Sequence, residues 1–234
     1  SGAALYTNED LTACVGKESI DPEGEPLTYA YAWYRDTELM EELTDLRVPS
    51  SETLRGQTWQ VVVTPSDPLS EGASGTSSIV IQNSPPMLED VSVTPEGAGT
   101  LDELLCLPGL SSDLDGDEVT YTYSWSVNGT SLSETEGTLD PSHYSKGDAV
   151  TCTAIPTDGV ALGLAKVAEE LLIENTPPSI ESVVVGPEFI STGDTLTCEY
   201  LGFSDPDGSE EPDNSTYQWF VNGVLVEEET TAAF

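Results

Sequence analysis

The stretch "DLDGDEVTYTYSW", residues 113–125, places three acidic residues at alternate positions directly before an apolar strand. Side chains of an extended chain alternate between its two faces. The residues that share one face here are Val119, Tyr121, Tyr123 and Trp125. Threonine and serine occupy the other face. The stretch therefore predicts an acidic loop followed by a half-buried antiparallel strand.

The same pattern occurs three times in the chain. "DPEGEPLTYAYAW", residues 21–33, aligns with residues 113–125 without a gap, and "DPDGSEEPDNSTYQW", residues 205–219, contains two extra residues. Three cysteines, Cys14, Cys106 and Cys198, precede these stretches at a spacing of 92 residues. Because a fixed period indicates copied structural units, we predict a tandem repeat of 92 residues, in about two and a half copies.

Two Pro-Pro pairs mark the predicted domain boundaries, in "NSPP" after Ile81 and "NTPP" after Ile173. Diproline blocks helix and supplies no backbone donors, so it makes a short semi-rigid hinge. We expect three units: residues 1–83, without the first strand; residues 84–175, complete; and residues 176–234, the N-terminal half only. Such units imply that the chain is part of a longer array, or that a neighbouring subunit completes its ends.

The remaining pattern predicts an all-β fold of antiparallel sandwiches. Short runs such as "WQVVVTP", "AVTCTAI" and "SIVIQ" are separated by Gly, Pro, Asp and Ser clusters. The predicted core markers are Trp33, Trp125 and Trp219. Residues 36–47, "DTELMEELTDLR", form an exception, because their leucines have helical spacing. A short helix or a turn is expected there in place of an edge strand.

The charge of the chain restricts its partners. It has 43 Asp and Glu against 6 Lys and Arg, and a formal net charge of −37. Such a surface repels nucleic acid and anionic lipid, and it favours cations and basic surfaces. No apolar run is long enough to span a membrane. We therefore expect no nucleic acid and no direct membrane insertion, and neighbouring repeats or identical subunits as partners.

The sequence offers little catalytic chemistry. It contains one histidine, His143, and neither a glycine-rich phosphate loop nor a "GxSxG" motif. Acidic residues are abundant, so a carboxylate pair for glycoside hydrolysis stays open. We expect a non-catalytic protein. The alternative is a carbohydrate- or protein-binding module of a secreted enzyme, which would display exposed aromatic residues such as Tyr34, Trp59 and Phe220.

These segments resemble the tandem Ig-like repeats of the polycystic-kidney-disease (PKD) type in very long secreted bacterial proteins. The likeness rests on the "NSPP" and "NTPP" joints, "VTPSD", "DLDGDEVTYTYSWSVNG" and "YSKGDAVTCTAIPTDG". In that family the domains serve as stalks, spacers or adhesive fibre segments. The resemblance implies a segment of a filament, stalk or adhesin shaft, extracellular or at the cell surface.

The cysteines of the second unit fit this resemblance. Cys106 and Cys152 would lie on strands B and F with Trp125 between them, the Cys, Trp, Cys order of Ig domains. We predict a disulfide between them and hence an oxidising compartment, with two buried free thiols as the alternative. Val61 stands where the second unit has Cys152, so Cys14 is expected to be a buried thiol or to bond another chain. Cys198 is expected to lack a partner within the chain.

The acidic loops have two interpretations. Alternating carboxylates can converge on calcium, which accepts six to eight oxygen ligands in flexible geometry. The candidate ligands are Asp113, Asp115 and Asp117, with Asp21, Glu23 and Glu25 in the first copy and Asp205 and Asp207 in the third. The spacing is not that of an EF-hand. The other interpretation is an Asx-type turn. Asn128 and Asn214 also fit the glycosylation acceptor pattern, which stays open.

Overall fold

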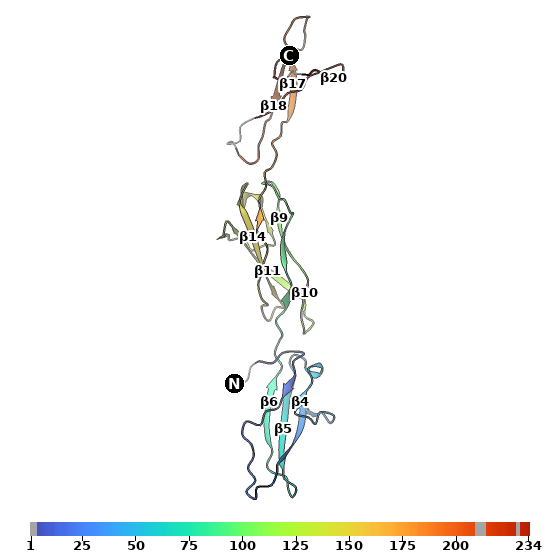
Figure 1. The fold of residues 1–234 in the computed structure, drawn as a ribbon, viewed down its shortest axis with the longest axis vertical. Coiled ribbons are helices and arrows are strands. Elements are labelled where there is room, and N and C mark those ends of the chain that lie inside the picture. The colour runs from blue at the N-terminus through green and yellow to red at the C-terminus, as the bar shows by residue number, and fades with distance from the viewer. Residues whose placement is uncertain (1–3, 209–213, 228–229) are drawn as a thin grey trace. The chain divides into compact units, whose positions relative to one another are not determined.

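The computed structural model describes residues 4–208, 214–227 and 230–234 (Figure 1). Two short 3-10 helices, η1 (Ser50–Glu52) and η2 (Pro141–His143), are the only helices in this described part of the chain. All other regular structure is β. The chain divides into two compact units, one of Ser1–Val91, Pro108–Thr122 and Ala154–Lys166, the other of Ser92–Leu107, Tyr123–Thr153 and Val167–Phe234.

The first repeat contains a four-stranded antiparallel sheet in the order β3-β2-β5-β6 and a two-stranded pair β1-β4. Its strands are β1 (Leu11–Thr12), β2 (Thr28–Arg35), β3 (Glu38–Leu39), β4 (Arg47–Val48), β5 (Thr58–Ser66) and β6 (Gly75–Val80). The core consists of Leu11, Ala13, Trp33, Val48, Trp59, Val61 and Ile81. The rings of Trp33 and Trp59 meet edge to face, with centroids 6.4 Å apart.

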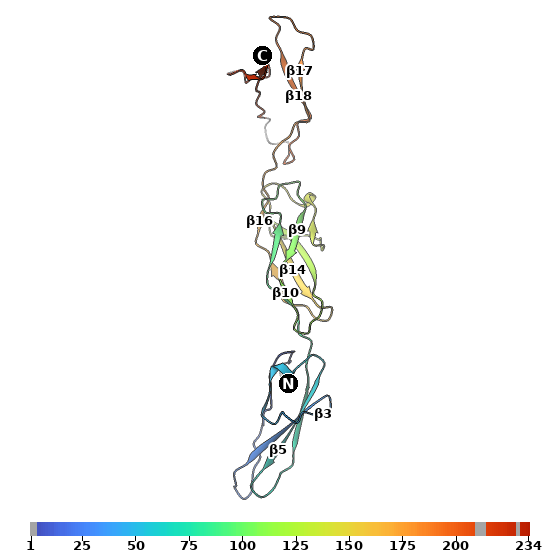
Figure 2. The same cartoon turned by 90° about the vertical axis from the view of Figure 1, so that its right-hand side faces the viewer.

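The second repeat has a sheet of order β12-β11-β14-β15, with β16 also on β14, a sheet β13-β9-β8 and a pair β10-β7 (Figure 2). Its strands are β7 (Met87–Leu88), β8 (Val91–Thr94), β9 (Leu104–Pro108), β10 (Ser111–Ser112), β11 (Thr120–Val127), β12 (Thr130–Ser131), β13 (Thr138–Leu139), β14 (Ala149–Thr157), β15 (Lys166–Val167) and β16 (Leu171–Leu172). Two antiparallel sheets in this order make an Ig-like sandwich.

The third segment contains β17 (Ser182–Gly186), β18 (Thr197–Leu201), β19 (Phe220–Val221) and β20 (Val224–Leu225). β17 pairs with β18, and β19 pairs with β20, both antiparallel. Trp219 stacks on Phe234 with centroids 5.3 Å apart. The all-β antiparallel fold class predicted from the sequence is therefore confirmed.

Each of the three predicted core tryptophans is anchored by the same kind of hydrogen bond. Trp33, Trp125 and Trp219 are 3%, 1% and 9% exposed. Each indole N–H donates to a backbone carbonyl, of Asp45, Glu136 and Thr231 respectively, in every case at 2.9 Å. A buried indole needs such a partner. The sequence therefore places the same buried group and the same bond in each copy.

The leucine spacing of residues 36–47 does not produce a helix. Asp36 and Thr37 have φ angles of 48° and 77°, as in the tight turns that open a hairpin. The Met40 amide then donates to the Trp33 carbonyl at 2.9 Å, so the backbone is used for the β2–β3 hairpin. A turn follows, in which the Leu43 amide donates to the Met40 carbonyl. The hairpin turn overrides the helical pattern here.

Candidate functional site: the acidic loops

The loop between β10 and β11 is an Asx turn. Oδ1 of Asp113 accepts the backbone amides of Asp115 at 2.8 Å and of Asp117 at 3.3 Å. Gly116 has a φ of 81°, a conformation that glycine adopts without strain. The turn interpretation therefore describes the local backbone. It leaves the side chains of Asp115 and Asp117 free to face outward from the loop.

Asp115 binds the segment that precedes the first Pro-Pro pair. Its Oδ2 accepts the Ser84 amide at 2.6 Å, and its Oδ1 accepts the Thr7 hydroxyl. Ser84 and Thr7 are both 2% exposed. The Ser84 amide is the last backbone donor before Pro85 and Pro86, which have none. A buried donor must be satisfied, and the acidic loop satisfies it.

Arg55 joins Asp117 to the same segment. Its guanidinium donates to both carboxylate oxygens of Asp117, with Nη2 and Oδ1 3.2 Å apart, and Nη1 also donates to Oδ1 of Asn83 at 2.6 Å. The hydrogen bond to Asp117 raises the pKa of Arg55. Both side chains are partly exposed, so solvent screens the attraction between their charges. Its main effect is positional.

Asp158, in the hairpin after β14, completes the arrangement. Its Oδ1 accepts the amides of Val160 at 2.7 Å and Ala161 at 2.6 Å, and its Oδ2 accepts Nδ2 of Asn83 at 2.7 Å. The Ala161 amide and then the Asn83 side chain lower the pKa of Asp158 to about 2. The carboxylate thus stays ionised and holds the side chain of Asn83.

The same bonds recur near the second Pro-Pro pair. Oδ2 of Asp207 accepts the Thr176 amide at 2.9 Å, and Oδ1 accepts the Thr100 hydroxyl at 2.6 Å. The Asp207 amide donates to Oδ1 of Asp205 at 3.0 Å, so the Asx turn also recurs. Asp207 and Thr176 follow Asp115 and Ser84 by 92 residues each. A repeated loop therefore binds a repeated linker.

The acidic loop of the first repeat has the turn without that partner. Oδ1 of Asp21 accepts the amides of Glu23 at 2.6 Å and Gly24 at 3.0 Å. Glu23 is exposed and Glu25 is half-buried. Within the described residues, neither of these two carboxylates has a hydrogen-bond or ion-pair partner. This loop is the counterpart of Asp113–Asp117 with its binding side open.

The geometry allows a cation at two places. Carboxylate oxygens of Asp113, Asp115 and Asp117 lie within 4.8 Å of one another, and so do those of Asp21, Glu25 and Asp67. Oδ2 of Asp113 is buried without a hydrogen-bond partner, and such an oxygen suits a hard cation. In the second loop, however, the Arg55 guanidinium already neutralises Asp117. Calcium there would compete with Arg55, and its binding stays a prediction.

The second repeat contains the disulfide between Cys106 on β9 and Cys152 on β14, with Cα atoms 6.0 Å apart. It joins the two sheets. Both half-cystines are at most 2% exposed. Cys198 is a half-buried free thiol whose residue pairs with Val185 of β17.

Cys14 is exposed, so its predicted burial is wrong. The reason is a shift of register. The amide of Ala13 donates to the Leu46 carbonyl, whereas in the second repeat the amide of Cys106 donates to the Gly137 carbonyl. Ala13 therefore occupies the inward position of Cys106, and Cys14 points to the other face. The apolar alternation of Leu11 and Ala13 carried this signal, which the equal cysteine spacing concealed.

The structure also places the candidate aromatic ligand-binding residues and the candidate glycosylation sites. Trp59 is fully buried, so it is a core residue and no exposed ligand platform. Tyr34 is half-buried and Phe220 is 58% exposed. Asn128 has a φ of 50°, and its side-chain amide donates to Asp148 while its oxygen accepts the Ala149 amide. A sugar on Asn128 would have to break these turn bonds. Asn214 is exposed.

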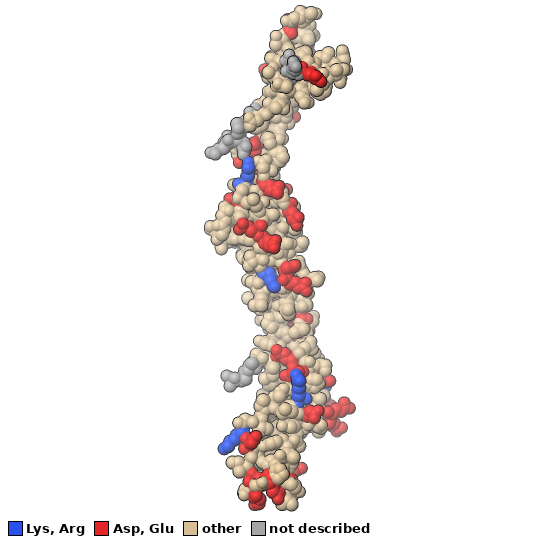
Figure 3. Space-filling view, in the orientation of Figure 1, with Lys and Arg blue, Asp and Glu red and all other residues tan. Residues whose placement is uncertain are grey.

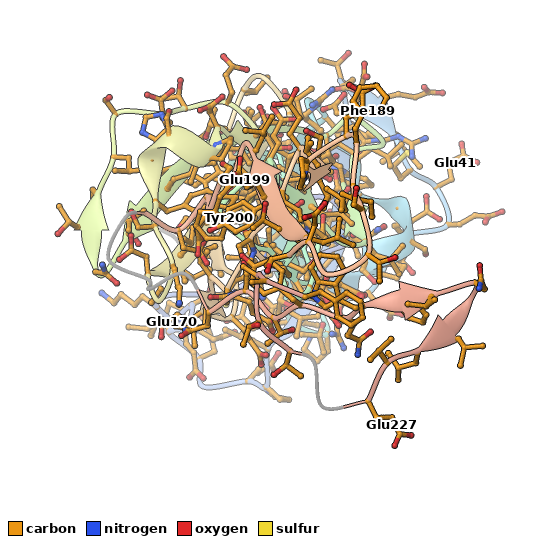
Figure 4. The ribbon with its side chains drawn as sticks, turned by 90° about the horizontal axis from the view of Figure 1, so that it is seen from above. Glu41, Glu170, Phe189, Glu199, Tyr200 and Glu227 are labelled. Atoms are coloured by element: carbon orange, nitrogen blue, oxygen red, sulfur yellow. A yellow bond between two sulfur atoms is a disulfide. The ribbon has the colours of Figure 1, made fainter. Side chains whose placement is uncertain are left out.

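The unused acidic residues lie on the surface. The face shown in Figure 3 carries many Asp and Glu and few Lys and Arg. Figure 4 shows the carboxylates of Glu41 and Glu227 directed away from the ribbon. His143 lies with Nε2 3.7 Å from Glu134, in a partly exposed pair. None of these groups converges on a common point.

Comparison with known proteins leaves the family open. No protein-family model matches the chain, and no curated protein matches it. Among solved structures, the crystal structure of chicken CNTN1 FN1-FN3 domains aligns with 12% sequence identity and a TM-score of 0.32. The alignment covers 74% of this chain and 66% of that one, so it spans slightly less than two thirds of the solved structure. Among the described residues, no helix is long and apolar enough to cross a membrane.

Proposed function

We propose that this chain is a non-catalytic structural segment of a tandem array of PKD-like Ig repeats, in an extracellular filament, stalk or adhesin shaft. One observation carries the proposal. The linker bonds of Asp115 recur at Asp207, 92 residues later, with the same donors: a backbone amide before Pro-Pro and a threonine hydroxyl. Because these hydrogen bonds between loop and linker are copied together with the repeat, we infer that they serve to connect consecutive repeats.

The linker bonds give such an array a defined connection. Diproline limits the backbone angles, and the acidic loop holds the residue before it. Because the amides of Ser84 and Thr176 pair with a carboxylate, each linker gains charge-assisted bonds, which are stronger than neutral ones. Consecutive repeats joined in this way would resist bending at the linker. Neighbouring repeats or identical subunits are then the natural partners.

The disulfide supports an extracellular location. Disulfides persist in oxidising compartments and are rare in the cytosol. The bond Cys106–Cys152 lies within one sandwich, where it secures the fold of that repeat. The acidic surface agrees with this location, because it keeps shafts apart unless cations screen or bridge them.

The proposal includes calcium as a ligand of the acidic loop of the first repeat. Carboxylate oxygens of Asp21, Glu25 and Asp67 lie within 4.8 Å of one another there. A bound ion would cancel local repulsion. The alternative, a binding module, loses one of its three aromatic candidates, since Trp59 is buried.

Imaging of the native material tests the proposed function. An antibody against this chain should label the surface of intact cells or secreted fibres, and electron microscopy should reveal an axial repeat along the labelled structures. Labelling that requires cell lysis, or labelled particles that are isolated globules, would contradict it.

A further inference from the structure

In the second repeat, residues 83–94, here called the joint segment, lie on a receiving surface of that repeat. Asn83 and Ser84 bind Asp158 and Asp115. β7 then pairs with β10, and β8 with β9. Val91 and Val93 are 8% and 7% exposed, and the carbonyl oxygen of Ser92 lies 4.0 Å from the sulfur of Cys152. The joint segment is therefore both a linker and a core strand.

Two glycines make room for the joint segment. A Cβ built on Gly163 would lie 2.0 Å from the carbonyl oxygen of Pro86. A Cβ on Gly109 would lie 1.8 Å from Oδ1 of Asp90. At Gly163 the close atom belongs to the backbone, so that position excludes a side chain while the segment is seated. At Gly109 the close atom is the end of the Asp90 side chain, which can rotate away.

The first repeat has glycine at both equivalent positions, Gly72 and Gly16. No described segment lies against them as the joint segment lies against Gly163 and Gly109. Gly72 donates its amide to Pro65 at 2.8 Å, as Gly163 does to Pro156 at 2.8 Å. The three atoms nearest the Cβ position of Gly72 all belong to Pro65, and no described atom lies within 4 Å of that of Gly16, the register equivalent of Gly109. The space that Pro86 and Asp90 fill in the second repeat is open in the first.

The polar contacts of the receiving surface are also repeated. Asp67 accepts the amides of Leu69 at 2.7 Å and Ser70 at 2.6 Å, as Asp158 accepts those of Val160 and Ala161. These backbone bonds lower the pKa of Asp67. Glu23 stands in the position of Asp115, at the open side of the Asx turn. The first repeat therefore has acceptors for both polar contacts of a joint segment.

The first repeat also has an open groove that reaches its core. Its volume is about 670 Å³, and it runs between residues 11–15 and 73–79. Among its lining residues are Leu11, Ala13, Trp33, Trp59, Val61 and Ile79. Val61 is the register equivalent of Cys152, the residue beside β8 in the second repeat. Part of the groove lining is therefore apolar beside the position that corresponds to Cys152, whose sulfur lies near the Ser92 carbonyl.

We propose that the first repeat is a docking site for an extended segment of the joint type, with Ser or Thr before Pro-Pro and alternating valines after it. Asp67 and Glu23 would accept its polar groups, Gly72 and Gly16 would admit its backbone, and the groove would take its valines. This mode adds a strand to a sheet edge and fills alternate pockets. The proposal rests on the proposed function, because it names the partner that a repeat array supplies.

Binding of a synthetic peptide to the whole chain tests the docking site. The probe is a labelled, end-blocked peptide of residues 83–95, "NSPPMLEDVSVTP", titrated with the 234-residue chain and followed by fluorescence anisotropy. We expect saturable binding. A peptide with Val91→Asp and Val93→Asp should bind at least about tenfold more weakly, because charged groups cannot enter the groove without cost.

Chain variants locate the site. Gly72→Ala should weaken binding of the peptide by at least about tenfold, since the new Cβ would occupy the place of the peptide carbonyl that corresponds to that of Pro86. Gly186→Ala is the matched control, because Gly186 has only an ordinary neighbour at 4.0 Å and should leave binding unchanged. Circular dichroism melts establish that both variants are folded. Equal binding of the aspartate peptide, or equal binding by Gly72→Ala, would overturn the proposal.

A second measurement does not depend on the affinity of a free peptide. A chain with a second copy of residues 83–93 directly before Ser1 should unfold at a midpoint at least about 4 °C higher than the same chain with aspartate in place of both valines of the copy. If the peptide does not bind and the unfolding midpoint is also unchanged, the proposed docking site is wrong. Surface labelling decides the proposed function separately, so failure of one is distinguishable from failure of the other.

Discussion

At the scale of single residues, Gly163 shows how closely the linker lies against the second repeat. The glycine has no φ in the left-handed region, so its role is space and not backbone freedom. Just before this contact along the chain, Asn83 and Ser84 are held by Asp158 and Asp115. One missing Cβ and two carboxylates thus define where the chain leaves the first repeat.

Gly163→Ala should lower the free energy of unfolding by about 1 to 3 kcal/mol, because the new methyl group displaces the Pro86 carbonyl. Gly186→Ala should change it by less than about 1 kcal/mol. Equilibrium denaturation in urea measures both. Equal stability of the two variants would mean that the linker does not lie on Gly163 in solution.

The carboxylate of Asp158 should report linker binding through its titration. Its pKa of about 2 is below the ordinary value of 3.8, so it stabilises the folded state fully above pH 4 and loses this contribution as the pH falls through 2. Asn83→Ala should raise the pKa of Asp158, though not to 3.8, because the Val160 and Ala161 amides remain. Carbon-detected NMR titration measures the shift. An unchanged pKa would show that Asn83 is not its partner.

At the scale of elements, β9 and β14 owe their fixed relation to packing and to one covalent bond. The disulfide closes a loop with a sequence separation of 46 residues. The two other repeats lack such a bond among the described residues. In the first repeat, the edge-to-face pair of Trp33 and Trp59 and the side chain of Val61 occupy the intersheet space.

Reduction of the disulfide should destabilise the second repeat by about 4 kcal/mol in the chain-entropy model. Calorimetry with and without reductant should show one transition moving to lower temperature. The shift should persist in Cys14→Ser with Cys198→Ser and disappear in Cys106→Ala with Cys152→Ala. A transition temperature that does not change with reductant would contradict the structural role of the disulfide.

At the scale of the whole molecule, the net charge of −37 acts against every compact state of this chain. Like charges at the surface repel one another over about 10 Å at 0.1 M salt. The few basic side chains are partly committed locally, as Arg55 is to Asp117 and Arg47 to Asp10. Stability should therefore depend on the ions in solution.

Raising NaCl from about 10 mM to about 500 mM should raise the melting midpoint by screening this repulsion. Calcium compared with chelator at constant ionic strength separates binding from screening. A further rise with calcium that is lost in Asp21→Asn would support an ion in the first loop. Identical melting midpoints with calcium and with chelator would show that calcium does not stabilise this chain.

Much of the architecture could be read from periodicity. Alternation and the repeated Trp positions predict the all-β fold and its core, because buried strands require an apolar face of period two. The disulfide was predicted from the Cys, Trp, Cys order. Of the short helix or turn expected over residues 36–47 in place of an edge strand, only a turn forms, and the edge strand β3 is present, because a hairpin turn at Asp36 and Thr37 uses the backbone donors that a helix needs.

The acidic loops mark the limit of the sequence. The sequence alone shows that these loops are copied together with the Asn-Ser/Thr-Pro-Pro linkers, and it leaves a calcium loop and an Asx turn as two interpretations. Only the tertiary structure decided that the loop binds the linker, since the Ser84 amide and the Asp115 carboxylate are brought within 2.6 Å by folding. Hydrogen bonds depend on distance and direction in space, whereas a repeat period records only order along the chain.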